Sequence, residues 1–467
     1  MKSQTQFTSP PPVAASSMRR DVMAAYFAAG SRIGAWALVS AIVYRLASPA
    51  QFAMLALIRG TIGILNYAAI GLAPALIRHF AAASQSHSPL QSDDPKQPGE
   101  ITGPGAALSN ANERAIFSTG IVIAAASTVV GLIITLFYAR FFDRIHVVPP
   151  GLGRAAPWAV ILIGLGTLLR LFSDAPGALL KTKGRIAKDN YILASGDIFW
   201  ALATAAAFHW AGLLTASITY AAAGLVVAAA RTLAVQQLKS RFWPLELRLI
   251  QWRIGNALLS FGSLLLLAQI AEYFYAPTDY ILINHFFGPG EVAAYAPGTQ
   301  IDMALLMLVT GLAAVLLPKS ALAHTRGDPK LLRQYYSRGT FASIAVLIAA
   351  SAGIWFLYPV IFHLWFGAHP PNTHAILDLV LIGTIVGGSS AVGRSVLIGM
   401  GRIKAVTAAA IIAGVVNVLA SYCFVKFAHA GLRGILYGTL IAVVGRCGVW
   451  MPAYVLLVLR RENALAK

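Results

Sequence analysis

Five arginines lie within long apolar segments of this sequence, where charged side chains are uncommon. They are Arg32, Arg59, Arg170, Arg394 and Arg446. A charged side chain at the centre of a membrane-crossing helix costs about 2.5 to 3.5 kcal/mol even on insertion scales, so it needs a partner, a water-filled cavity or an anionic ligand. The guanidinium group is a planar, permanently charged fork that matches the oxygens of carboxylates and phosphates. These arginines are therefore candidates for a site that holds an anion.

Three of the five also have a purely structural explanation. Arg170 precedes Asp174 by four residues, so the two can pair along one helix. Arg394 and Arg446 lie near the ends of their apolar segments, and long basic side chains can extend to the membrane surface.

Arg32 and Arg59 lie well inside their segments, so an extension to the membrane surface does not explain them. Arg59 shares a helical face with Asn66, seven residues later. We expect both arginines to face a polar lumen.

The acidic residues with regular spacing lie in the second half of the chain. Glu272, Tyr275 and Asp279 follow one another at three and four residues and therefore fall on one stripe of a helix, and Asp302 lies in the next apolar segment. One interpretation pairs these acids with the first-half arginines across a central cavity. The other makes one or more of them a proton or cation site that drives transport.

Composition decides the class of protein. Hydrophobic residues make up 58% and charged residues 11% of the 467 residues, and the mean hydropathy is +0.70. These values exclude an ordinary water-soluble domain. The net charge of +19 would indicate nucleic-acid binding in a soluble protein, but here the basic residues fall mostly in short loops, where they determine topology. We predict an all-α polytopic membrane protein that binds no nucleic acid.

Hydropathy predicts twelve transmembrane helices. Residues 198–230 are too long for one crossing of a hydrocarbon core of about 30 Å, so two helices with a turn near residues 209–212 are expected there. The other ten predicted spans are residues 22–44, 52–77, 116–138, 157–179, 258–287, 291–318, 341–366, 376–399, 405–425 and 434–459.

The chain is internally duplicated. Short matches recur in the same order, which indicates two homologous six-helix halves. The matched pairs are Pro49 with Pro289, Gly71-Leu72-Ala73 with Gly311-Leu312-Ala313, and Gly184-Arg185-Ile186 with Gly401-Arg402-Ile403.

The duplication and the polar segments give a domain prediction. Basic residues concentrate in the loops on the side of both termini, which places both termini in the cytoplasm and makes the two repeats parallel. The expected units are a cytoplasmic tail (1–20), an N-terminal six-helix bundle (21–233) with a polar insert (81–112), an interfacial linker (234–255), a C-terminal six-helix bundle (256–460) and a second cytoplasmic tail (461–467).

Three stretches carry a resemblance to a known family. They are RLASPAQFAMLAL followed by IGLAPALIRHF, the stretch Tyr275 to Ile301 (YAPTDYILINHFFGPGEVAAYAPGTQI), and GRSVLIGMGRIKAV followed by VVNVLASY. With the six-plus-six layout, residues 21–460 resemble Wzx-type polysaccharide-export flippases of lipopolysaccharide, O-antigen or exopolysaccharide biosynthesis, in the superfamily that also contains the MATE antiporters. The insert at 81–112 departs from that pattern.

The resemblance implies a V-shaped, MATE-like pair of bundles around a largely cationic cavity in the bacterial inner membrane. The implied cargo is a polyprenyl-pyrophosphate-linked oligosaccharide that moves from the cytoplasmic to the outer leaflet. Membrane lipids and other polysaccharide-assembly proteins are the implied partners, and no cofactor or metal is expected.

Residue roles follow from that cargo. Residues expected at the substrate are Arg32, Arg59, Asn66, Tyr67, Arg170 and Arg394, with Trp36, Tyr275 and Tyr295 as further candidates for contact with the sugar. Residues expected at a coupling proton or sodium ion are Glu272, Asp279 and Asp302.

Two alternatives belong to other functional classes. A cation-coupled multidrug antiporter of the same fold would favour an acidic, aromatic lumen, and the basic residues of the first two spans count against it. A membrane O-antigen polymerase or lipid-linked glycosyltransferase would need a sizeable soluble loop or interfacial catalytic carboxylates, whereas the predicted outer loops are short. No phosphate-binding loop, HExxH pattern or nucleophile elbow occurs in the sequence, so we expect the protein not to be an enzyme.

Overall fold

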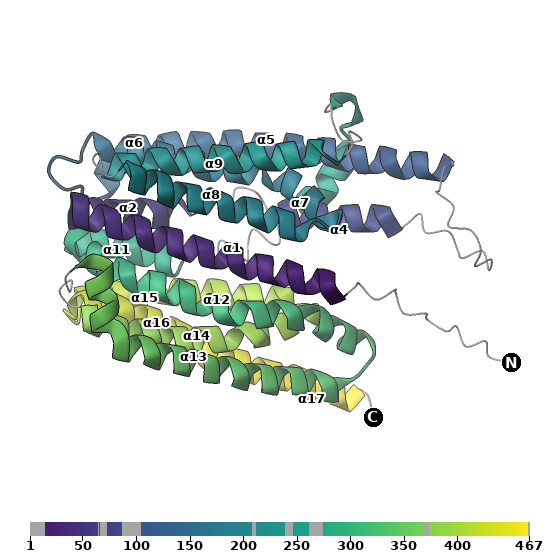
Figure 1. Ribbon diagram of the computed structural model, residues 1–467. Helices are drawn as coiled ribbons and strands as arrows, with labels where there is room; N and C mark the ends of the chain where they lie inside the picture. Colours follow the sequence, from purple (N-terminus) through teal and green to yellow (C-terminus); the bar gives the residue numbers. More distant parts are fainter. Residues whose placement is uncertain are drawn as a thin grey trace.

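The computed structural model describes residues 15–63, 65, 72–85, 104–207, 212–238, 246–260, 274–367 and 373–465. Within these ranges the chain forms helices joined by turns, with no strand. The long helices lie side by side along one direction (Figure 1). Helix α1 (Ala15–Ile42) begins and α17 (Met451–Leu465) ends at the same end of the bundle, which we call the terminal end. The opposite end is called the distal end.

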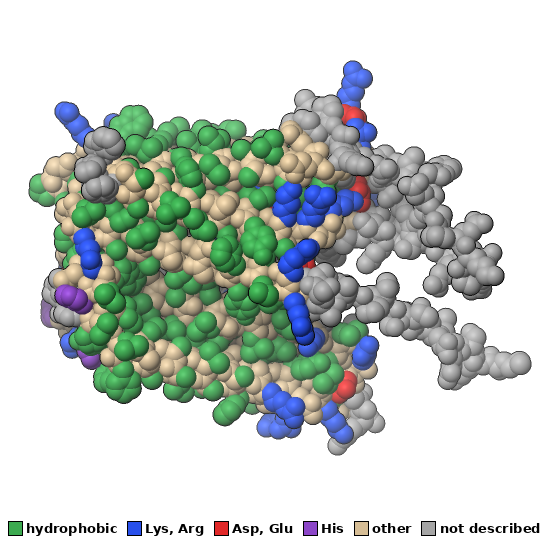
Figure 2. Space-filling model, in the orientation of Figure 1, with side chains coloured by type: hydrophobic (Ala, Val, Ile, Leu, Met, Phe, Trp, Pro, Cys, Tyr) green, Lys and Arg blue, Asp and Glu red, His purple; other side chains and the backbone are tan. Residues whose placement is uncertain are grey.

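The molecule is an all-α polytopic membrane protein, as predicted. Nine helical segments in the described ranges are long and apolar enough to cross a membrane. Large hydrophobic side chains stay exposed along these helices, for example Phe356 at 73% and Phe341 at 74%. Figure 2 shows hydrophobic side chains spread over the visible face of the helices, while lysine and arginine gather mainly at the terminal end. Such a surface suits contact with lipid chains rather than water.

The first half of the structure contains the helices up to residue 236. In chain order they are α1 (Ala15–Ile42), the π-helix η1 (Val43–Ala47), α2 (Pro49–Ile62), α4 (Leu72–Gln85), α5 (Pro104–Ile145), α6 (Ala155–Phe172), α7 (Asp174–Thr182), α8 (Ile186–Ala206) and α9 (Leu213–Gln236).

The second half begins after the short 3₁₀ helix η3 (Leu247–Leu249). Its helices are α11 (Ala276–Phe287), α12 (Pro289–Thr325), α13 (Pro329–Phe366), α14 (Thr373–Gly399), α15 (Ile403–Lys426), α16 (Gly431–Val443), the π-helix η4 (Val444–Trp450) and α17 (Met451–Leu465).

Several helix boundaries in the structure differ from those predicted from hydropathy. The span predicted at 52–77 appears as α2 and α4, and the fifth span begins at Ile186 rather than near residue 198. That earlier start was missed because Lys188 and Asp189 lie in its first turn, and Asp189 is buried by partners on other helices. Helices α4 and α5 also extend into both ends of the predicted polar insert.

The duplicated sequence forms the same turn in both halves. After α7 the Arg185 N–H donates to the Leu180 carbonyl and the Gly184 N–H to the Lys181 carbonyl. After α14 Arg402 and Gly401 make the corresponding bonds to Leu397 and Ile398. Both glycines have positive φ, at 71° and 76°. This is the Schellman arrangement, in which glycine adopts the left-handed conformation without a Cβ clash.

Small residues bring α6 and α9 together in the first half. A Cβ on Gly224 of α9 would lie 2.4 Å from the Gly166 carbonyl oxygen of α6, so the two backbones touch. Such close approach is common between membrane helices, where packing and hydrogen bonds replace the hydrophobic effect. It places Arg170, one turn beyond Gly166, in the interior of the first half.

The two halves are joined by polar contacts at the distal end. The Arg45 guanidinium donates to the last carbonyls of α13, at 2.8 Å to His363 and 3.1 Å to Trp365. Asn284 of α11 bonds both the N–H and the carbonyl of Val147, at 2.8 Å and 3.0 Å. The final carbonyls of a helix have no partner within that helix and carry partial negative charge, so an arginine is a favourable cap for them.

Candidate functional site

The first half encloses a basic cavity of about 470 Å³, which we call the first-half cavity. Five basic and two acidic side chains line it, together with Tyr220 and Thr167. The charged lining residues are Arg32, Arg59, Arg170, Lys181, Arg231, Asp174 and Asp197. Three arginines predicted at the substrate site therefore lie on one cavity.

Arg59 of α2 lies in an aromatic cage. Its guanidinium carbon is 4.1 Å from the ring centre of Trp36, 4.9 Å from Trp200 and 5.9 Å from Tyr220. The Trp36 and Trp200 rings are stacked at 5.7 Å. Cation–π contacts hold the charge without neutralising it. The buried Nη1 atom of Arg59 has no hydrogen-bond partner among the described residues, so it can still donate to an acceptor in the cavity.

Arg32 and Arg170 share the carboxylate of Asp197. Arg170 Nη1 lies 2.7 Å from Asp197 Oδ1, and Arg32 Nε lies 3.5 Å from Oδ2. Asp197 is only 3% exposed. The Nε and Nη2 atoms of Arg170 are buried and have no hydrogen-bond partner in the described part of the chain. One carboxylate thus serves two guanidinium groups and leaves donors unused.

The predicted pairing of Arg170 with Asp174 is wrong. The helix breaks at Ser173, where α6 ends and α7 begins, so Asp174 does not follow on the same helical face as Arg170. Asp174 instead binds Arg231 Nη1 at 2.8 Å.

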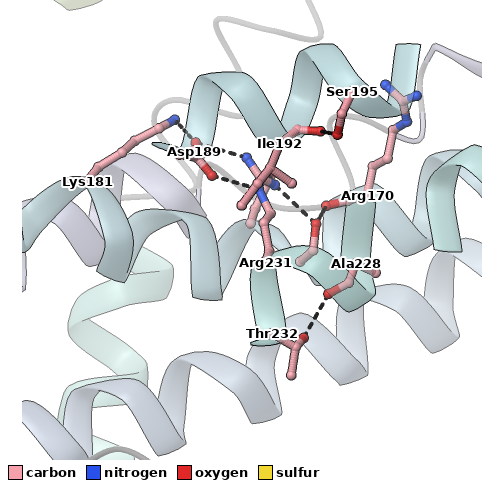
Figure 3. Close-up of polar contacts among 10 residues, drawn as sticks. Arg170, Lys181, Asp189, Ile192, Ser195, Ala228, Arg231 and Thr232 are labelled. Carbon is pink, nitrogen blue, oxygen red and sulfur yellow. Dashed lines mark hydrogen bonds and ion pairs between the residues drawn. The ribbon is translucent and has the colours of Figure 1, made fainter. Parts of the chain in front are cut away.

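Arg231, on the wall of the first-half cavity, is the centre of a buried polar cluster (Figure 3). It is 2% exposed, and it donates to both carboxylate oxygens of Asp189, at 2.8 Å and 3.1 Å. It also donates to Asp174 and to Ser173 Oγ, and Lys181 adds a contact of 3.3 Å to Asp189. Arg231 belongs to α9 and ties α7, α8 and α9 together.

The second half contains its own cavity of about 270 Å³, which we call the second-half cavity. Asp279 of α11 is fully buried there. Its carboxylate accepts hydrogen bonds from Thr439 at 2.8 Å, Tyr295 at 3.1 Å and Asn417 at 3.2 Å. All three donors are neutral, so they stabilise a negative charge without cancelling it.

Asp302 and two arginines line the same cavity. Asp302 accepts a hydrogen bond of 2.5 Å from Thr384. Arg394 lies on the cavity wall, and Arg446 is 8% exposed and donates to the Tyr275 hydroxyl at 3.2 Å. Arg446 therefore does not extend to the membrane surface, since its side chain is buried on the wall of the second-half cavity.

The structure does not support one shared pairing network. The two cavities have no lining residue in common among the described residues, and Asp279 and Asp302 are bonded within the second half. Asn66, Tyr67 and Glu272 lie outside the described residues. Trp36 joins Arg59 in the first half, while Tyr295 and Tyr275 line the second-half cavity.

Sequence reasoning missed several cavity residues. Asp189 and Asp197 lie in the first and fourth turns of α8, and a search for carboxylates within or beside the apolar segments would have found them. Trp200 and Tyr220 gave no signal, because an aromatic residue in an apolar helix is usually a packing residue. Asn417 carried a weak signal as a polar residue inside a span. Within the described residues, no group of three or more His, Cys, Asp or Glu side chains could hold a metal ion.

Comparison with known proteins agrees with this architecture. Residues 265–423 match the MatE family model. Comparison with curated protein sequences gives no match. The match to the family model covers less than half of the chain and lies entirely within the second half.

Solved structures cover nearly the whole chain. An inward-facing multidrug resistance MATE family transporter of the MOP superfamily superposes with a TM-score of 0.75 at 16% identity, covering 92% of this chain and 96% of that one. An outward-facing structure of such a transporter gives 0.65 at 15% identity, covering 96% of both chains. A MOP superfamily transporter from Pyrococcus furiosus gives 0.61 at 14% identity, covering 97% of this chain and 96% of that one. The chain therefore has the fold of MATE transporters.

Proposed function

We propose that this protein is a flippase for a lipid-linked cargo with a phosphate-bearing head group. In its most specific form, it moves a polyprenyl-pyrophosphate-linked oligosaccharide from the cytoplasmic to the outer leaflet for surface polysaccharide synthesis. The observation that carries this proposal is the set of buried, unused guanidinium N–H groups of Arg59 and Arg170 in a cavity with more basic than acidic side chains.

Those donors set the chemistry of the cargo. A buried N–H without an acceptor costs about 1 to 3 kcal/mol, and more when the group is charged. A phosphate offers several negatively charged acceptor oxygens and would satisfy Arg59 and Arg170 together. A lipophilic cation would instead meet the excess positive charge of the cavity. Trp36, Trp200 and Tyr220 add aromatic surface beside Arg59, and sugar rings are suited to such surface.

The fold and the distal contacts support transport by alternating access. Arg45 and Asn284 join the two halves at the distal end, and the TM-score is higher with an inward-facing relative than with an outward-facing one. Lysine and arginine gather mainly at the terminal end (Figure 2), which supports a cytoplasmic location of both termini. We place the protein in the bacterial inner membrane with its cargo entering from the terminal end, and with other polysaccharide-assembly proteins as partners.

A relative provides a precedent for a change of cargo on this fold. The transporter from Pyrococcus furiosus is described as having a binding pocket of reverse polarity that suggests a different function. A basic first-half cavity is consistent with such a change in the present chain.

The test is translocation of a polyprenyl-pyrophosphate oligosaccharide by the purified full-length protein in proteoliposomes. Arg59→Ala should reduce the rate at least tenfold, because one charged hydrogen bond is worth about 1.5 to 3 kcal/mol. Arg59→Lys keeps the charge but loses the planar fork of the guanidinium group. Its translocation rate should lie between the rates of the unchanged protein and of Arg59→Ala. The matched control is Arg402→Ala, which removes an exposed arginine from a turn at the terminal end. Normal translocation by Arg59→Ala protein that is stably inserted would remove Arg59 from the mechanism.

A cation-coupled multidrug antiporter is the second candidate. The buried carboxylate of Asp279 and the partly buried carboxylate of Asp302 favour it, because they could bind a proton or sodium ion. Efflux of a lipophilic cation from the same proteoliposomes distinguishes the two functions. Cation efflux without movement of the lipid-linked sugar would assign the protein to the antiporter class.

A further inference from the structure

A second basic pocket lies at the terminal end, outside both cavities, between α1 and α8. It has a volume of about 410 Å³. Arg20, Arg185 and Lys188 line it together with the hydroxyl-bearing Tyr191 and Ser195, and no carboxylate among the described residues belongs to its lining. The proposed transport function does not use any of these residues.

The start of α8 holds this pocket in place. The Schellman turn ends at Arg185, which is the residue directly before α8. The carboxylate of Asp21 accepts a hydrogen bond of 3.1 Å from the Ala187 N–H and so fixes α1 against α8. Lys188 donates to Gln237, the residue directly after α9, at 2.9 Å. Neither Arg20 nor Arg185 makes an ion pair within the described part of the chain, so their charges are available.

The pocket faces the surface of the bundle rather than the first-half cavity. Asp189, Leu193 and Asp197, which follow one another at four residues on α8, point to the first-half cavity and its polar cluster. Lys188 and Tyr191 lie on another face of the same helix. Figure 2 shows lysine and arginine side chains gathered over the terminal ends of α8 and α1, beside exposed hydrophobic side chains.

An exposed apolar strip adjoins the basic residues. On α1, the exposed fractions of Met23, Tyr26 and Phe27 are 70%, 49% and 50%. The Phe27 ring makes an edge-to-face contact with the Tyr191 ring of α8, with 5.9 Å between the ring centres. The strip runs from the pocket towards the centre of the membrane-crossing helices. The basic side chains at the surface match the anionic head group of a phospholipid, and the apolar strip directly beneath them matches its acyl chains.

We propose that this pocket binds the phosphate of an anionic phospholipid, with Arg20, Arg185 and Lys188 around the head group and the acyl chains along Met23 and Phe27. Basic pockets between membrane helices attract anionic head groups, and a phosphate accepts charge-assisted hydrogen bonds from arginine and lysine. A zwitterionic lipid carries its own positive group and gains much less from three basic side chains. The proposal does not depend on the cargo.

The experiment measures lipid binding to the full-length protein in nanodiscs of phosphatidylcholine with increasing phosphatidylglycerol. Bound lipid is counted by native mass spectrometry after release from the disc. The test variant is Arg185→Gln/Lys188→Gln, and the matched control is Arg402→Gln/Lys404→Gln, which removes the same charge from the equivalent turn of the second half. The test variant should bind phosphatidylglycerol about tenfold or more weakly, and the control should behave like the unchanged protein.

Further measurements distinguish an anionic phospholipid from other molecules that carry a phosphate group. Arg185→Lys/Lys188→Arg should retain binding, because the charge is kept. An equal loss of phosphatidylglycerol binding in Arg185→Gln/Lys188→Gln and in Arg402→Gln/Lys404→Gln would overturn the proposal in favour of general surface charge. Binding of phosphatidylcholine to the unchanged protein as strongly as phosphatidylglycerol would also overturn it. Inorganic phosphate that displaces the lipid at equal concentration would show a free-phosphate site. Preferred binding of polyprenyl pyrophosphate over phosphatidylglycerol would show a cargo-docking site, and either result would overturn the phospholipid assignment.

Discussion

In the first half, Arg170 and Arg231 are held by carboxylates that come from neighbouring helices. In the second half, Asp279 is held by the neutral side chains of Thr439, Tyr295 and Asn417. The turns after α7 and α14 have the same geometry, yet the buried arginines of the first half are held by carboxylates, whereas the buried Asp279 of the second half is held by neutral donors. A duplicated fold has therefore acquired two kinds of polar interior.

The difference has consequences for ligand binding. In the first half, two guanidinium groups share Asp197, so an added anion gains donors that the protein leaves unused. In the second half, a carboxylate with neutral donors can take up a proton or a sodium ion without stranding a basic partner. We therefore assign cargo to the first half and ion coupling to the second, as a hypothesis that the following variants test.

The largest effect is expected at Asp279. Asp279→Asn keeps the size of the side chain but removes the charge that would bind a coupling ion. Transport driven by a proton or sodium gradient should fall to the rate without a gradient, while downhill exchange of the cargo continues. The measurement is translocation in proteoliposomes with and without each imposed gradient.

The control for this change is Asp378→Asn, which removes a partly exposed carboxylate of the same half that pairs with His374. It should leave the gradient dependence intact. Gradient-driven transport that survives in the double variant Asp279→Asn/Asp302→Asn would exclude both acids from coupling and weaken the division of roles between the halves.

A second variant tests whether ion pairs hold the first half together. Arg231→Met removes the two hydrogen bonds to buried Asp189 and leaves Lys181 as its remaining basic partner, so the protein should be destabilised by about 3 kcal/mol. Thermal unfolding of the full-length protein in detergent measures the loss. Arg114→Met removes one partner of the half-exposed pair with Glu246 in the same half and should cost about 1 kcal/mol or less.

Removal of the stranded carboxylate sharpens this test. Arg231→Met/Asp189→Leu should recover part of the stability, because a well-packed apolar pair can replace a buried ion pair. If Arg231→Met is no more harmful than Arg114→Met, charge pairing does not stabilise the first half.

The sequence predicted the membrane class and the duplicated layout because both depend on patterns along the chain. Hydropathy identifies apolar spans, and the repeated glycine-arginine motif marks a turn that the backbone forms in the same way twice. Arg32, Arg59 and Arg170 were selected from the sequence because a charge inside an apolar helix is costly wherever its partner lies, and all three line the first-half cavity.

The partners themselves could not be predicted. Asp197 meets Arg170 only because α6 and α8 pack beside each other, and no local spacing encodes that contact. The break at Ser173 separates Arg170 from Asp174 although their spacing is that of a helical pair. The aromatic cage of Arg59 likewise combines α1, α2, α8 and α9.

The last prediction concerns the contact between the halves. His146 lies after α5, beside the Asn284 contact with Val147, and its Nε2 is 2.8 Å from the Tyr138 hydroxyl. Burial lowers the pKa of His146 from 6.5 to about 4. The folded protein therefore keeps this imidazole neutral at pH values where the unfolded chain binds a proton.

The neutral state of His146 predicts how stability depends on pH. Stability should be unaffected by this group above pH 6.5, should decline as the pH falls from 6.5 to 4, and should change no further below that, with a total loss of about 3 kcal/mol. His146→Gln should remove this part of the pH dependence, whereas His363→Gln, at an exposed histidine side chain of the second half, should leave it unchanged. Thermal unfolding at a series of pH values measures both. If the profile of His146→Gln matches that of the unchanged protein, His146 is not kept neutral in the fold, and acid would not weaken the contact between the halves through this residue.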